Sequence, residues 1–294
     1  MVISHSQYRY IQLAWTVVFF SLHSNIFSQN NSECDLKFID HLVNKGCYEE
    51  ALFLLDSSDC SLIHMNDSIN YLRGWSLYSI NQPALSSESL LKTTPTSSFY
   101  LKSHFYAMFN YAQTGYYDKA TEVLDKIELK TDTLISLKNY QIAGIKLLQG
   151  DLPSFEEWFG KIDKGLSAIK DSYNSLLSTS IEMENHRSKS PFIAGLMSGI
   201  IPGAGKFYAG KKGGAISAFL STAGLGLVTW ENYRKSGSKS FKTIAFGSLF
   251  AVTYIANIYG SVFTVRILKT EYKENVKSTI LFNLHIPLLS TFGK

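Results

Sequence analysis

The distribution of apolar and polar residues changes near residue 190. Before this point, charged and polar residues are interleaved with apolar ones, as in the amphipathic helices of a soluble domain. After it come three uncharged apolar tracts, at 192–204, 213–230 and 243–265. The second and third approach the roughly 20 apolar residues that a membrane-spanning helix needs. The pattern predicts an all-α protein, with a helical domain followed by a two-to-three-helix transmembrane module at 190–268.

The helical region repeats with a period close to 34 residues. Gly46, Asn81, Gly115 and Gly150 follow one another at steps of 35, 34 and 35 residues. Gly and Asn tolerate the left-handed conformation that ends many helices, so we expect a repeat turn at each of these positions. Residues 36–165 are therefore predicted to form helical hairpin repeats. A helical bundle without repeats is the alternative.

This period resembles that of the tetratricopeptide family. Tyr48, Tyr116 and Tyr117 follow the turns much as the consensus aromatic of that family does, whereas Asn81 and Phe155 depart from its glycine and its small residue. The resemblance implies stacked hairpins with a concave groove that binds a protein partner. The groove candidates are Tyr71, Trp75, Tyr78 and Tyr106. Aromatic residues at helical spacing also form cores, so a structural role is the alternative.

A Pro- and Gly-rich segment, 202–212, connects the first and second apolar tracts. It resembles a small membrane domain in which two helices flank a P-G-x-G-x-[FY]-Y-x-G turn. The matching residues are Pro202, Gly203, Gly205, Phe207, Tyr208 and Gly210. The resemblance implies membrane embedding and a tight hairpin turn, and it implies no catalytic residue. A phosphate-binding loop is not expected, because Lys212 stands where that motif needs Ser or Thr.

Gly195, Gly199 and Gly203 follow one another at intervals of four residues. This spacing predicts a glycine face for close helix packing, within the hairpin or between copies in a homo-oligomer. The alternative is that glycine is simply common in membrane helices. If all three tracts span, the C-terminal tail lies on the opposite side from the repeats. If the first tract is re-entrant, this arrangement inverts.

The two ends of the chain and the linker complete the predicted organisation. Residues 1–29 have the pattern of a signal peptide, either cleaved or retained as an anchor, which would export the repeats. Residues 166–189 are predicted to be a polar linker or stalk. The tail, 269–294, either lies on the bilayer surface or packs back on the module. Cys34, Cys47 and Cys60 either include one disulfide or are small buried residues.

Charge and motif content exclude several functions. The net charge is only +4, and the basic residues cluster beside the apolar tracts, which suits lipid headgroups rather than nucleic acid. The seven histidines show no metal-ligand spacing, and no nucleophile motif occurs. We therefore predict no enzyme activity, no cofactor and no metal.

The predicted function is that of a scaffold or protein-interaction protein in the cell inner membrane, with its repeats on the periplasmic side. Its expected partners are a protein, bound by the repeats, and the lipid bilayer. The alternative is an accessory component of a membrane transport or insertion assembly. Ionisable residues within the membrane would favour that alternative, and the long tracts contain none.

Overall fold

The computed structural model describes residues 35–56, 66–163 and 169–293, so the predicted signal peptide, Cys34 and Cys60 lie outside the described residues. Within these ranges the chain forms helices and no strand. The helices belong to two compact units, with the boundary between Glu128 and Leu129. The two units are described separately below.

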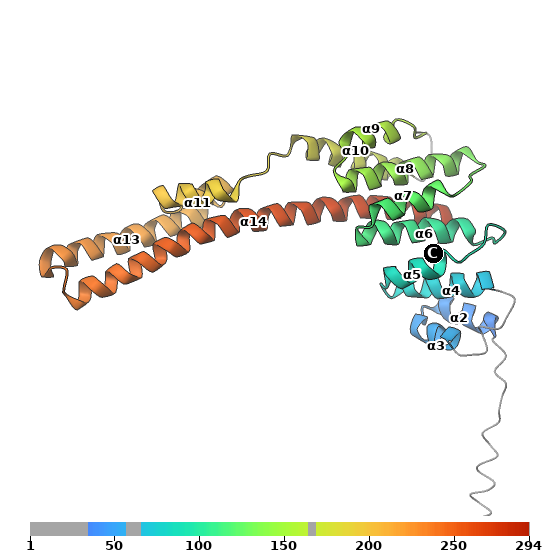
Figure 1. Cartoon of the computed structure of the whole chain (residues 1–294), viewed down its shortest axis with the longest axis horizontal. Helices are drawn as coiled ribbons and strands as arrows, with labels where there is room; N and C mark the ends of the chain where they lie inside the picture. Colours follow the sequence, from blue (N-terminus) through green and yellow to red (C-terminus); the bar gives the residue numbers. More distant parts are fainter. Residues whose placement is uncertain (1–34, 57–65, 164–168, 294) are drawn as a thin grey trace, which may run out of the picture. The chain divides into compact units, whose positions relative to one another are not determined.

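The first unit consists of three short helix pairs (Figure 1). They are α2 (Leu36–Lys45) with α3 (Tyr48–Asp56), α4 (Asn66–Ser79) with α5 (Pro83–Leu90), and α6 (Tyr100–Thr114) with α7 (Tyr117–Asp125). Each helix packs against the next one in the sequence. This is the arrangement expected of stacked helical hairpins.

The turns within the pairs share one backbone geometry. Gly46, Asn81 and Gly115 have φ values of 81°, 60° and 85°. In each turn the N–H of this residue bonds the carbonyl three residues before it, and the next N–H bonds the carbonyl five residues before itself. This double hydrogen bond is the Schellman motif, which satisfies the last carbonyls of a helix. Gly150 in the second unit has the same two bonds and a φ of 78°.

Equivalent positions after these turns are buried. The fifth residue after each turn is buried, and so is the ninth. The fifth residues are Ala51, Ser86, Ala120 and Phe155, and the ninth are Leu55, Leu90, Leu124 and Phe159. The spacing of the sequence therefore corresponds to a repeated pattern of burial.

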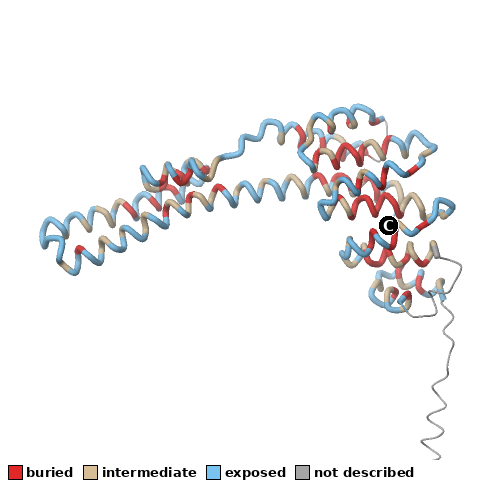
Figure 2. Tube along the Cα trace, viewed as in Figure 1, coloured by how far each residue is buried: buried red, intermediate tan, exposed pale blue. Residues whose placement is uncertain are grey.

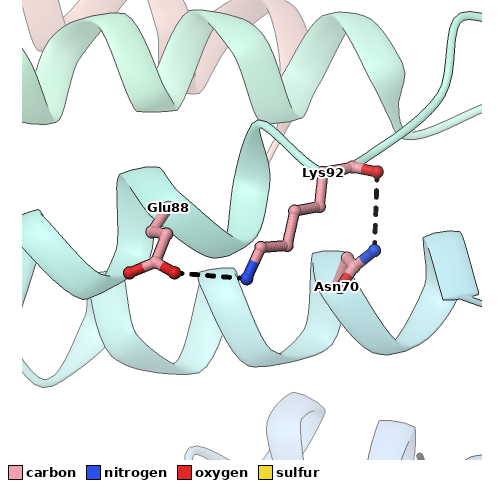
Figure 3. A network of polar contacts seen from close by, with 3 residues as sticks. All are labelled: Asn70, Glu88 and Lys92. Carbon is pink, nitrogen blue, oxygen red and sulfur yellow. Dashed lines mark hydrogen bonds and ion pairs between the residues drawn. The ribbon is translucent and has the colours of Figure 1, made fainter.

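Helices α4 and α5 illustrate how closely the helices of a pair approach. A Cβ atom on Gly74 would lie 2.5 Å from Cγ of Leu90, so a larger residue would force the Leu90 side chain to move. The Ser86 hydroxyl donates to the Gly74 carbonyl at 2.7 Å. At the end of α5, the Asn70 amide donates to the Lys92 carbonyl at 3.5 Å, while the Lys92 ammonium pairs with Glu88 (Figure 3). The pair is thus held by both packing and polar contacts.

Aromatic side chains fill the space between α4 and α6. Tyr106 is fully buried, and its ring meets those of Trp75 and Tyr78 edge-on at centroid distances of 4.9 and 5.0 Å. The prediction of a groove position is therefore wrong for Tyr106, and Trp75 is also buried. Both rings pack between hairpins, where burial of a large aromatic ring contributes to the core.

The second unit begins with a fourth helix pair, α8 (Asp132–Gln149) and α9 (Leu152–Phe159). Then follow α10 (Lys170–Asn185), α11 (Pro191–Ile200), α12 (Ala204–Ala209), α13 (Lys212–Ser236) and α14 (Phe241–Phe292). Most of the predicted polar linker is therefore the helix α10. The predicted tail is the continuation of α14, which has 52 residues.

Two helices of this unit, α13 and α14, are long and apolar enough to cross a membrane. They lie side by side, and their surface is largely exposed (Figure 2). Helix α11 has only 10 residues and is about 15 Å long, half of the roughly 30 Å hydrocarbon thickness. The first apolar tract is therefore too short to cross as a straight helix.

Candidate functional site

The matched Pro-Gly segment forms two tight turns around the short helix α12. Gly203 precedes α12 with a φ of 88°, and Gly210 follows it with a φ of 91°. Gly210 repeats the double hydrogen bond of the repeat turns, because its N–H bonds the Phe207 carbonyl and the next N–H bonds the Lys206 carbonyl. The segment therefore folds as a short helix between two left-handed glycines, not as one turn between two spanning helices.

Glycine is required where α12 meets its neighbours. A Cβ atom on Gly205 would overlap the backbone oxygen of Ala194 in α11. A Cβ atom on Gly203 would overlap the Ala215 oxygen in α13. Because backbone atoms cannot give way as a flexible side chain can, both positions exclude every larger residue.

The three glycines of the predicted face do not share one helix. Gly195 lies against α14, where an added Cβ would stand 2.8 Å from a methyl carbon of Val262. Gly199 also faces α14, at 3.9 Å from Ile258. Gly203 lies beyond the end of α11 and contacts α13 instead. The predicted single face is therefore wrong for Gly203, because the helix ends at Ile200.

Hydrogen bonds of hydroxyl groups connect α11 and α12 to α14. The hydroxyls of Ser198 and Ser261 lie 2.7 Å apart, and the Gly205 N–H donates to the Ser198 hydroxyl at 2.9 Å. The Tyr254 hydroxyl donates to the Gly199 carbonyl at 2.5 Å. In apolar surroundings such bonds join helices that lack a hydrophobic driving force for association.

The aromatic residues of the turn differ in their surroundings. The Tyr208 hydroxyl accepts a hydrogen bond from the Ser190 N–H at 3.1 Å, and the ammonium of Lys189 lies 5.8 Å from the Tyr208 ring centre. Phe207 is exposed, and Pro202 is half-buried. Tyr208 thereby fixes the start of α11 to α12.

A second constellation, which the sequence did not reveal, lies at the C-terminal end of α14. We call residues 280–292 the docking segment. Ile280, Leu284 and Leu288 are buried there, and the segment packs against α8 and α10 (Figure 1). A Cβ atom on Gly144 of α8 would overlap the side chain of Leu284, so this glycine makes room for the leucine.

Pro287 explains the polar contacts of the docking segment. A proline has no N–H, so the carbonyl four residues earlier, that of Asn283, loses its helical donor. The Tyr140 hydroxyl donates to this carbonyl at 3.1 Å, and the Gln141 amide donates to the next carbonyl, that of Leu284, at 2.9 Å. Two side chains of α8 thus supply donors for carbonyls in the turn before Pro287.

Helix α10 completes this contact. The Asn283 amide donates to the Ser175 hydroxyl at 2.9 Å. Burial raises the pKa of Tyr140, so its hydroxyl stays protonated and able to donate. Burial also lowers the pKa of His285 below its usual 6.5. The docking segment is therefore held by matched donors as well as by apolar packing.

The remaining groove candidates lie on the first unit. Tyr71 is half-buried and stacks on Phe99 with a centroid distance of 4.3 Å. Tyr78 is half-buried as well, and burial raises the pKa of each tyrosine to about 12. The Lys102 ammonium lies 4.2 Å from the Trp75 ring centre, a cation–π contact. These side chains form a partly open aromatic surface with one cation.

The described residues contain no group of three or more His, Cys, Asp or Glu side chains that could share a metal ion. Cys47, which the structure also describes, carries a free thiol. The fold and these sites define an all-helical protein of packed short helix pairs with two long apolar C-terminal helices. Comparison with known family models, with curated proteins and with solved structures gives no match.

Proposed function

We propose that this chain is a non-enzymatic, membrane-anchored scaffold of the cell envelope whose helix pairs bind a protein partner. The observation that carries the proposal is the docking segment, which fastens the end of α14 to α8 and α10. Because α14 is also a candidate membrane span, this contact links a helix pair directly to the membrane anchor. The resemblance of the pairs to tetratricopeptide repeats supports protein binding.

The docking segment also supports a topology with two crossings. Residues in contact must lie on the same side of a bilayer, so the chain between α8 and the docking segment crosses an even number of times. Helices α13 and α14 account for two crossings. We therefore expect α11 and α12 to enter the membrane and return on the side of the helix pairs.

The orientation follows from the N-terminal signal pattern. If residues 1–29 direct export, the helix pairs and the docking segment are periplasmic. The loop between α13 and α14 is then cytoplasmic, and it is flanked by Arg234, Lys235, Lys239 and Lys242. Basic residues favour the cytoplasmic side. The opposite end of α13 and α14 is basic as well, so basic residues alone do not decide the orientation. The signal pattern decides the orientation we propose.

The aromatic surface around Tyr71 and Tyr78 is the proposed partner site. Its half-buried rings would lose little conformational entropy on binding, and Lys102 would attract a carboxylate of the partner. A photo-crosslinking residue at position 71 or 78 in cells should capture one defined protein. The same residue at Leu85, an exposed position on α5, is the control.

Three further results decide this proposal. Lys102→Glu should weaken the crosslink from position 71 several-fold without releasing the protein from membranes. A pattern of crosslinks from position 71 identical to that from position 85 would contradict a specific partner site. Extraction of the protein from membranes by alkaline carbonate would contradict the anchor.

One observation favours the alternative role in a transport or insertion assembly. Lys206 is half-buried, and its ammonium lies 3.8 Å from where a Cβ of Gly260 would stand, beside the apolar tract of α14. Asn257, one turn away, is buried with both its amide atoms unpaired. Ionisable and polar groups at membrane depth often mark a substrate path. In that case Lys206→Met would fail to restore the transport or insertion function to a deletion strain, while partner crosslinking and membrane anchoring stay unchanged. Lys211→Met would restore that function.

A further inference from the structure

We propose that the face of α14 that meets α11 binds an anionic phospholipid. The inference rests on the membrane embedding in the proposed function and is independent of its protein partner. Two adjoining cavities carry it. One is an apolar groove between α11 and α14, and the other is a smaller basic pocket at the start of α11.

The groove has the size and lining of an acyl-chain site. Its volume is about 720 Å³, which lies within the range of small-ligand pockets. Its walls include Phe192 and Leu196 of α11 and Ile258, Val262 and Phe263 of α14. Gly195 lets α11 pack closely on Val262 of α14, and Gly199, whose added Cβ would stand 3.9 Å from Ile258, lines the groove without a side chain to fill it.

The groove ends at positive charge. Arg266 lines its end, and Arg187, Lys189 and Lys269 line the adjoining pocket of about 250 Å³. We call these four residues the cation cluster. The two linings share no residue but are neighbours in sequence, because Arg266 and Lys269 are one helical turn apart on α14 and Lys189 is two residues from Pro191 at the groove. Neither lining contains Asp or Glu.

No ion pair neutralises the cation cluster among the residues that the structure describes. Lys189 makes a cation–π contact with Tyr208, and Arg266 makes one with Phe263. These contacts position the side chains and leave their charge uncompensated. All four side chains are exposed, so water screens their mutual repulsion, and an anion bound among them would gain attraction from several like charges.

The depth of the two cavities matches one lipid leaflet. The apolar tract of α14 ends at Val265, so the cation cluster begins at the level of the headgroups. From Arg266 back to Ile258 the helix rises about 12 Å, close to the ~15 Å depth of half a bilayer. A phosphate on the cation cluster would therefore place an acyl chain along the groove. Basic pockets between membrane helices bind anionic headgroups in this way.

An anionic phospholipid explains both cavities together. Free phosphate would use only the cation cluster, and a zwitterionic lipid would bring no net charge to it. A second copy of this chain would have to bring an acidic group to the groove end. These are the rival occupants that an experiment must separate.

Native mass spectrometry of the full chain in detergent is the test. Phosphatidylglycerol, phosphatidylcholine with the same acyl chains, and inorganic phosphate are titrated separately. We expect phosphatidylglycerol to bind at least tenfold more tightly than phosphatidylcholine, and phosphate not to compete at millimolar concentration. Equal binding of the two lipids, competition by phosphate, or a dimer that retains no lipid would each overturn the proposal.

Two pairs of variants locate the site. Arg266→Gln with Lys269→Gln should remove the preference for phosphatidylglycerol, whereas Lys211→Gln with Lys212→Gln, an equal loss of charge outside the two linings, should keep it. Gly199→Leu should fill the groove and weaken binding of both lipids. Gly224→Leu on α13, where an added Cβ meets nothing within 4 Å, is the matched control.

Thermal unfolding of each variant in the same detergent separates loss of binding from loss of the fold. Retained preference in the Arg266 and Lys269 double variant, with normal unfolding, would refute the assignment of the headgroup site. The membrane anchor is measured separately by carbonate extraction. Failure of lipid binding in a protein that stays in the membrane would leave the proposed scaffold function intact.

Discussion

Truncation of Leu284 should release the docking segment from α8. This side chain is fully buried, and it occupies the space that Gly144 leaves open. Leu→Ala substitutions in cores cost about 2–5 kcal/mol, from lost burial and from the cavity left behind. Since about 1.4 kcal/mol corresponds to a factor of ten, amide hydrogens in the docking segment should exchange at least about 30-fold faster in Leu284→Ala.

Hydrogen exchange followed by mass spectrometry of peptides from the end of α14 measures this effect. Phe282→Ala is the matched control, because Phe282 lies two residues away on the same helix and is 63% exposed. Its exchange should change by no more than a few-fold. Similar exchange in the two variants, or unchanged protection in Leu284→Ala, would refute the reasoning that this helix end is held by packing on α8.

Three other predictions test separate features of the structure. Gly205→Ala should destabilise the packing of α12 on α11 by about 1–3 kcal/mol in thermal unfolding, because its Cβ would overlap a backbone oxygen of α11, whereas Gly213→Ala, with open space around it, should not. Gly115→Ala should lower the free energy of unfolding by about 1–2 kcal/mol, because Gly115 has a φ of 85°. Asn81→Gly, at a φ of 60°, should leave this free energy unchanged or raise it. The opposite order would contradict the left-handed turns. The docking segment should lose protection from hydrogen exchange as the pH falls through about 6.5. Burial lowers the pKa of His285 in the folded protein, so protonation favours the released segment. His285→Gln, measured at matched pH, should abolish this dependence.

The helix pairs were predictable from sequence because their signals are local. The Gly or Asn of each turn and the buried residues that follow it lie within one unit of about 34 residues. A left-handed turn needs only its own residue to tolerate positive φ. The resemblance of the Pro-Gly segment placed Gly203 and Gly210 in a tight turn, and both adopt positive φ. The four-residue spacing misassigned Gly203 to a continuous helix face because the end of α11 was not foreseen.

The docking segment was not predictable in the same way. Tyr140 and Gln141 meet their partners across 143 residues of sequence, and neither residue type signals a buried contact. Pro287 was the available signal, because a proline within an apolar run leaves a carbonyl that needs another donor. Sequence alone does not say which distant side chain supplies that donor. The two cavities along α14 were missed for the same reason, since their walls come from separate segments.

Site-specific labelling in intact cells and in opened cells tests the central claim most directly. The native cysteines are replaced by serine, and single cysteines are placed at Asp118 on α7, Ser238 in the loop after α13, and Gly293 at the end of α14. We predict that a membrane-impermeant maleimide labels positions 118 and 293 under the same condition and position 238 only under the other. Labelling of position 293 together with position 238, and apart from position 118, would contradict it.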